Sequence, residues 1–112
     1  MALLRDAGRP VPARRPDAYL VFQGVGTAPY AFTLGEDLRA AGHAVVLHAG
    51  GGKFKSQMKK ADASGAALAL IVGEDELEAA AVTIKPLRDA RPQERVGRAD
   101  LARRMAEILK GT

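Results

Sequence analysis

An uninterrupted apolar run from Ala66 to Val72, AALALIV, limits the folds open to this chain more than any other segment. A half-exposed strand alternates apolar and polar residues, whereas a run without polar residues is typical of a central strand covered on both faces. Gly73 follows the run and is expected to end the strand. A strand of this kind needs cover on both sides, so it predicts an α/β domain in layers.

Segments on either side of this run alternate between strand and helix patterns. Apolar, β-branched and aromatic residues predict four further strands, at Asp17–Gln23, His43–His48, Ala81–Lys85 and Gln93–Val96. Helical spacing predicts three helices, through Ala31, Leu34, Leu38 and Ala41, over Lys53–Ala63, and from an N-cap at Asp100 through Leu101, Met105, Ile108 and Leu109 to Gly111. The order implies a three-layer α/β fold, in which three helices flank a mixed five-stranded sheet with one antiparallel edge.

The chain has 112 residues, which is enough for one domain with a single core. Residues 1–16 carry three prolines and four arginines after only a short apolar start, so this segment is expected to be a linker or the remnant of a preceding domain. Residues 17–112 are expected to form the folded domain. We therefore suspect that the chain was cut from a longer protein.

Charge and cysteine content exclude several classes of function. The formal net charge of +4 suits a polyanionic partner, and the chain has no cysteine. A disulfide framework, a thiolate metal site and a cysteine nucleophile are therefore excluded, and a cytoplasmic location is expected. No apolar run approaches the roughly 20 residues needed to span a bilayer, so no membrane partner is expected.

The segment HAGGGKFK combines a glycine-rich turn with the start of the second predicted helix. Its glycines, Gly50, Gly51 and Gly52, resemble a phosphate-binding loop, but Lys53 is followed by Phe54 instead of the Ser or Thr that a Walker loop needs. The turn could therefore bind a nucleic-acid phosphate or base edge, or serve as a tight connection alone. On the helix, Lys55, Lys59 and Lys60 project away from the apolar face and favour anion binding.

Other polar residues give weaker indications. Gly24-Val25-Gly26 resembles the start of a dinucleotide fingerprint, but Pro29 stands where the third glycine should be, which favours a plain turn. His43 and His48 are too far apart along one strand to share a metal. The carboxylates of GEDELE could bind a metal or act as acid and base, but a solvated turn that starts a short helix is favoured. We find no catalytic constellation and expect no metal and no cofactor.

The stretch His48–Arg88 is similar to the C-terminal domain of bacterial histidyl-tRNA synthetases, which are class II aminoacyl-tRNA synthetases. The similarity covers the glycine turn, the lysine-rich helix, the buried strand and the Gly-Glu-x-Glu segment. It is most specific at the end of the lysine-rich helix, at Lys59, Ala61, Asp62, Gly65 and Ala66, and in the strand that follows the Gly-Glu-x-Glu segment, at Val82, Thr83 and Lys85. Two departures from the family pattern are a fifth strand with little apolar alternation, between Arg91 and Ala99, and Gly35, which is expected to interrupt the first helix.

The resemblance implies the fold of an anticodon-binding domain, which holds the anticodon loop of histidine tRNA while a separate catalytic domain of the parent synthetase activates histidine with ATP. It also implies a homodimer for the full-length protein. The residues that it places near the tRNA are Gly50, Gly51, Gly52, Lys53, Lys55, Gln57, Lys59 and Thr83. Because few aromatic residues are available for stacking, recognition is expected to depend on hydrogen bonds and phosphate contacts.

Two other functions remain open from the sequence. The first is a small nucleotide-binding α/β enzyme that uses the glycine turn. The second is a synthetase-like paralogue or docking module that kept the fold without tRNA recognition. The chain itself offers no catalytic residues for the ligase reaction, so any enzymatic role is expected to belong to a parent histidine-tRNA ligase.

Overall fold

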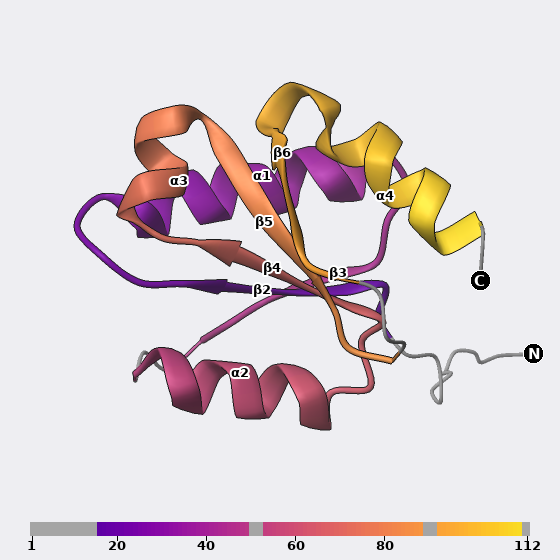
Figure 1. The fold of residues 1–112 in the computed structure, drawn as a ribbon, viewed down its shortest axis with the longest axis horizontal. Coiled ribbons are helices and arrows are strands. Elements are labelled where there is room, and N and C mark those ends of the chain that lie inside the picture. Colours follow the sequence, from indigo (N-terminus) through magenta and orange to yellow (C-terminus); the bar gives the residue numbers. More distant parts are fainter. Residues whose placement is uncertain (1–15, 50–52, 89–91, 111–112) are drawn as a thin grey trace, which may run out of the picture.

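The computed structural model describes residues 16–49, 53–88 and 92–110. These residues form three layers, with helices α1 and α4 on one side of a central sheet and helix α2 on the other (Figure 1). The strands are β2 (Ala18–Phe22), β3 (Val45–Leu47), β4 (Leu68–Val72), β5 (Ala81–Pro86) and β6 (Glu94–Gly97). The helices are α1 (Thr27–Ala40), α2 (Phe54–Ala63), α3 (Glu74–Ala79), the 3-10 helix η2 (Arg98–Asp100) and α4 (Leu101–Lys110).

The sheet is mixed, as the sequence predicts, with the strand order β3-β2-β4-β5-β6. β2 pairs in parallel with both β3 and β4, whereas β5 runs antiparallel to β4 and β6 runs antiparallel to β5. β4 therefore lies at the centre of the sheet, and four of its five residues are buried. The apolar run predicted a central strand, and this prediction is confirmed.

Alternating residues of the strands build a separate cluster on each side of the sheet. The larger cluster joins strand residues such as Leu20, Leu70 and Ile84 to Leu34 of α1 and Met105 of α4. The smaller cluster lies under α2 and joins the alternate strand residues Tyr19, Val21 and Ala69 to Ala61, with Phe54 and Met58 at its margin. α2 is thus held by a thinner apolar layer than the helices on the opposite side.

Helix α1 departs from one sequence expectation, whereas strand β6 agrees with the predicted fifth strand. Gly35 does not interrupt α1, because the helix continues through it to Ala40. The residue packs toward the sheet, where an added Cβ would lie 3.9 Å from the side chain of Leu20. The fifth strand predicted at Gln93–Val96 is present one residue further along, since residues Glu94 to Gly97 pair with β5. Helix α4 begins at Leu101, immediately after Asp100, as the predicted N-cap requires, and Asp100 is also the last residue of η2, which the sequence did not predict. The predicted stop at Gly111 lies outside the described residues.

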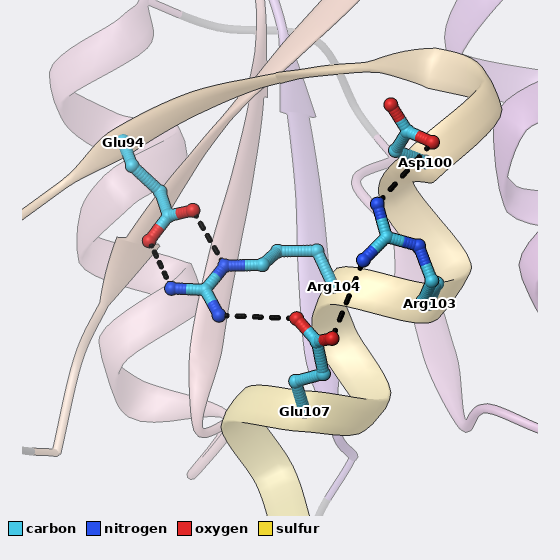
Figure 2. A network of polar contacts seen from close by, with 5 residues as sticks. All are labelled: Glu94, Asp100, Arg103, Arg104 and Glu107. Carbon is cyan, nitrogen blue, oxygen red and sulfur yellow. Dashed lines mark hydrogen bonds and ion pairs between the residues drawn. The ribbon is translucent and has the colours of Figure 1, made fainter.

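A network of charged side chains joins α4 to β6 (Figure 2). Arg104 of α4 donates two hydrogen bonds to the carboxylate of Glu94 in β6, at 2.7 and 2.8 Å, and a third to Glu107 at 3.2 Å. Arg103 adds contacts to Glu107 and Asp100 at 3.3 and 3.4 Å. The two-point contact fixes the last helix against a short edge strand that contributes little apolar surface.

Candidate functional site

Three parallel strands end at the same edge of the sheet, where the turns to α1, α2 and α3 begin. Open α/β sheets bind their ligands at this edge, outside the carboxyl ends of the strands. A pocket of about 550 Å³ lies there. It has an apolar part and an acidic wall, and is lined by Gln23, Gly24, Phe54, Ile71, Gly73, Glu74, Asp75 and Glu76.

Helix α2 brings a row of exposed lysines beside this pocket. Lys53, Lys55, Lys59 and Lys60 are all exposed, and Lys53 immediately precedes Phe54 of the pocket wall. Helical spacing puts Lys55, Lys59 and Asp62 on one side of α2. Asp62 contacts Arg88, just beyond β5, at 3.2 Å, so this side of the helix faces β5. Lys55 and Lys59 therefore border the sheet, whereas Lys60 points elsewhere.

The face of the sheet beside α2 is polar over β5 and β6. α2 packs mainly on β2 and β4. On β5, Val82 and Ile84 belong to the cluster on the opposite side, so Thr83 and Lys85 point to the side of α2. Arg95 of β6 pairs with Thr83 and faces the same way. Lys85 is exposed and the side chain of Arg95 is 51% exposed, so two cations border the lysine side of α2.

Glu76 connects the pocket to this polar face. One carboxylate oxygen accepts a hydrogen bond from the backbone N–H of Gly73 at 2.8 Å, and the other accepts from Thr83 at 2.9 Å and Arg95 at 2.8 Å. Burial raises the pKa of Glu76, but these hydrogen bonds and the charge of Arg95 outweigh it, so the pKa lies below its usual value. The short helix does begin at Glu74, and Glu74, Asp75 and Glu78 are exposed, as expected for the GEDELE segment, whereas Glu76 is only 8% exposed and departs from that expectation.

The turn from β2 to α1 forms the other rim of the pocket and is tied to α3. Glu74 accepts a hydrogen bond from the backbone N–H of Val25 at 3.0 Å, and the hydroxyl of Thr27 donates to the carbonyl of Gly24 at 2.8 Å. Gly24 has a φ of 119°, and an added Cβ would lie 2.5 Å from Cγ of Glu74. The site needs glycine at this position because both the conformation and the close approach exclude a side chain.

The structure brings together some of the residues that the sequence assigned to tRNA. Lys53, Lys55 and Lys59 lie exposed on or beside α2, and Lys53 precedes Phe54, which lines the pocket. Thr83 lies on the same face of the sheet, but it is only 8% exposed and its hydroxyl donates to Glu76. Gly50, Gly51 and Gly52 lie outside the described residues.

Gln57 lies on the buried side of α2. Its side chain is 2% exposed and forms two hydrogen bonds with the backbone of Phe22, accepting from the N–H at 2.9 Å and donating to the carbonyl at 2.8 Å. The amide thus fastens α2 to the end of β2. Its position, three residues after Phe54 and four before Ala61, was the signal that it belongs to the buried face.

Each of the two histidines contacts a polar group of the domain itself. Nδ1 of His48, at the end of β3, is 2.9 Å from the hydroxyl of Tyr19, and burial raises the pKa of the Tyr19 phenol. Nε2 of His43 is 3.2 Å from the carbonyl of Ala102 in α4. Within residues 16–49, 53–88 and 92–110, no group of three or more His, Cys, Asp or Glu side chains is arranged to hold a metal ion. In the same ranges, no helix combines the length and apolar character that crossing a membrane requires.

A sequence profile of the family described as "Anticodon binding domain" matches residues 17–108. The chain belongs to this family. The match begins one residue before β2 and ends within α4, so it includes every strand and helix that forms the pocket and the polar face.

Relatives of this anticodon-binding domain are histidine–tRNA ligases. The chain is 47% identical over 109 residues to that of Aromatoleum aromaticum, a match that covers 97% of this chain and 25% of the relative. It is 52% identical over 97 residues to that of Laribacter hongkongensis, a match that covers 86% of this chain and 23% of the relative. The chain thus spans about a quarter of the length of the curated relatives that it matches.

A solved structure agrees with the fold. Histidyl-tRNA synthetase from Nostoc sp. PCC 7120 superposes with a TM-score of 0.78 at 25% sequence identity, over 90% of this chain and 24% of the synthetase chain. The mixed five-stranded sheet with helices on both sides, expected from the sequence, is therefore confirmed as the fold of a synthetase anticodon-binding domain.

Proposed function

We propose that this domain binds the anticodon loop of histidine tRNA and serves as the RNA-reading module of a histidine–tRNA ligase. The identity to ligases of that specificity, 47% over 97% of the chain, supports the choice of tRNA. The observation that carries the proposal is the placement of exposed lysines of α2 beside a pocket at the carboxyl ends of the strands. Single-stranded RNA loops need both features, because cations bind the phosphates while recessed polar groups read the splayed bases.

Each residue then has a distinct role in the proposed complex. Lys55 and Lys59, with Lys53 at the start of the helix, contact phosphates of the anticodon loop. Thr83 holds the carboxylate of Glu76 in place at the pocket and thereby shapes the surface that meets a base. Gln57 acts indirectly, because its hydrogen bonds to Phe22 position α2 and its lysines. Gly50, Gly51 and Gly52, which precede Lys53, are assigned to the same surface on the basis of the sequence.

The wider setting of the domain is part of the same proposal. Since the chain spans about a quarter of its ligase relatives, a catalytic domain in the parent protein would activate histidine and charge the tRNA. Residues 1–16 would connect that catalytic domain to the folded domain at residues 17–112. The parent protein would be a homodimer and would act in the cytoplasm, where protein synthesis takes place.

Titration of two RNAs against the chain tests the proposal. One RNA is histidine tRNA and the other is the same tRNA with a changed anticodon, both measured at the same moderate salt concentration because phosphate contacts alone bind any RNA. We expect the changed anticodon to weaken binding by at least tenfold. Equal affinity would contradict anticodon recognition, and no binding of either RNA would support a docking module that kept the fold alone.

A further inference from the structure

The turn between β2 and α1 exposes two side chains that have no role within the domain. Gln23 is exposed, and its amide forms no hydrogen bond within the described residues. Val25 is 85% exposed, the highest value among the exposed large hydrophobic residues of the described chain. Polar and apolar groups of this kind, adjacent on one turn beside a pocket, are typical of a contact surface.

The backbone of this turn is nevertheless held firmly. The N–H of Gln23 donates to the carbonyl of Val72 in β4 at 3.0 Å, and the N–H of Val25 donates to Glu74 at 3.0 Å. Thr27 holds the carbonyl of Gly24 from the other side. A turn fixed by three elements presents its free side chains in one arrangement, which reduces the entropy lost when a ligand binds.

The surroundings of Gln23 indicate the chemistry of the ligand. The pocket that Gln23 lines also contains Phe54 and Ile71, which offer apolar surface to a flat ring. Carboxylates of Glu74, Asp75 and Glu76 repel a phosphate but accept hydrogen bonds from the amino groups of a base. Phosphates find their partners next to the pocket, at Lys53 and the lysine side of α2. The pocket therefore suits a splayed base, with its phosphates held outside.

We propose that the β2–α1 turn is part of the RNA-binding surface, where the amide of Gln23 hydrogen-bonds to the edge of one anticodon-loop base and Val25 packs on the same nucleotide. This inference rests on the proposed function and adds a specificity-determining side chain from an element outside the lysine helix. Gln23 is suited to the task because its amide has both a donor and an acceptor, so it distinguishes bases by their pattern of edge groups.

The test uses the full chain and four synthetic stem–loop RNAs. One RNA carries the histidine anticodon, and each of the other three has one anticodon base replaced. Gln23→Ala and Val25→Ala are compared with the wild-type chain and with Phe32→Ala, which trims another exposed hydrophobic residue, on α1. Circular dichroism melting of each variant verifies that these surface substitutions leave the fold intact.

Gln23→Ala is expected to weaken binding of the histidine stem–loop by about three- to tenfold, as for one lost hydrogen-bonded contact. For the RNA in which the base contacted by Gln23 is replaced, Gln23→Ala should cause no further loss of affinity, because the contact is already absent in the wild-type complex. Val25→Ala should weaken binding of the histidine stem–loop about threefold, and Phe32→Ala should bind as the wild type does.

Three other outcomes overturn the inference. If the wild type discriminates among anticodons and Gln23→Ala binds every RNA as the wild type does, the turn is not part of the surface, while the proposed function stands. An equal loss against all four RNAs excludes base reading by Gln23. If the wild type itself binds all four RNAs equally, or binds none, the proposed function and this inference fail together.

Discussion

The hydroxyl of Thr83 donates a 2.9 Å hydrogen bond to the carboxylate of Glu76, and so joins the first turn of α3 to the middle of β5. The same carboxylate oxygen accepts from Arg95 of β6 at 2.8 Å, and the other oxygen accepts from the N–H of Gly73 at 2.8 Å. One buried carboxylate thus connects the rim of the pocket with both antiparallel strands. Removing its charge should affect the stability of this part of the sheet.

Glu76→Gln is expected to lower the free energy of unfolding at pH 7 by about 2 kcal/mol, since hydrogen bonds to a charged group are lost or weakened. The pKa of Glu76 is lowered in the folded state, so the ionised carboxylate contributes stability above its unfolded pKa of about 4.3. This contribution disappears as the pH falls through the folded-state pKa. Urea denaturation at pH 7 and pH 3 should therefore reveal a difference between variant and wild type that shrinks in acid.

Glu78→Gln, a change at an exposed residue of the same helix, is the matched control and should leave the free energy of unfolding within about 0.5 kcal/mol of the wild type. A deficit of Glu76→Gln that stays constant between pH 7 and pH 3 would contradict the role of the ionised carboxylate.

Gln57→Ala should destabilise the domain by about 2 kcal/mol. The change leaves both the N–H and the carbonyl of Phe22 without their side-chain partner, in a partly buried position. Ser56→Ala, at the exposed neighbouring position, should change stability by less than about 0.5 kcal/mol. Thermal melting distinguishes the two variants. Equal melting temperatures for both would mean that the amide of Gln57 is dispensable for the fold and would return it to the candidate RNA contacts.

Residue spacing was sufficient to predict the layers of the fold. The continuous run that contains Leu70 specified a central strand, and the alternation of Val82 and Ile84 with Thr83 specified a strand with two different faces. The end of the short helix α3 had no glycine to mark it, because Ala80 takes the left-handed conformation there, with a φ of 52°.

The candidate site was harder to predict because its contacts join residues distant in the chain. Glu74, Asp75 and Glu76 look alike in the sequence, and the approach of Thr83 and Arg95 from other strands selects Glu76 as the buried one. The lysines of α2 were identifiable because helical spacing separates them from the apolar face. The sequence did not single out Gln23, since the role that we propose for it depends on a pocket that segments distant in the chain form around it.

Arg104→Ala should lower the free energy of unfolding by about 1 kcal/mol, because the two-point contact with Glu94 is the main polar link between α4 and β6 (Figure 2). For a domain of this size, such a loss corresponds to a decrease of about 5 °C in melting temperature. Arg103→Ala removes an arginine charge from the preceding residue but breaks only the contacts with Glu107 and Asp100, at 3.3 and 3.4 Å on the helix surface. A melting temperature for Arg104→Ala equal to that of Arg103→Ala would show that the link contributes nothing.

Lys55→Ala should reduce the salt dependence of RNA binding. Each phosphate contact to a single strand contributes about 0.7 to the slope of log affinity against log salt concentration, because one condensed counterion is released. Helical spacing puts Lys55 on the same side of α2 as Asp62, which contacts Arg88 just beyond β5, whereas Lys60 lies on another side of the same helix. We therefore expect Lys55→Ala to lower the magnitude of the slope by about 0.7 and Lys60→Ala to change it by much less. Fluorescence anisotropy with a labelled stem–loop RNA across a range of salt concentrations measures both slopes. Equal slopes for the two variants would mean that the lysines of α2 attract RNA through their overall charge and that Lys55 makes no defined phosphate contact.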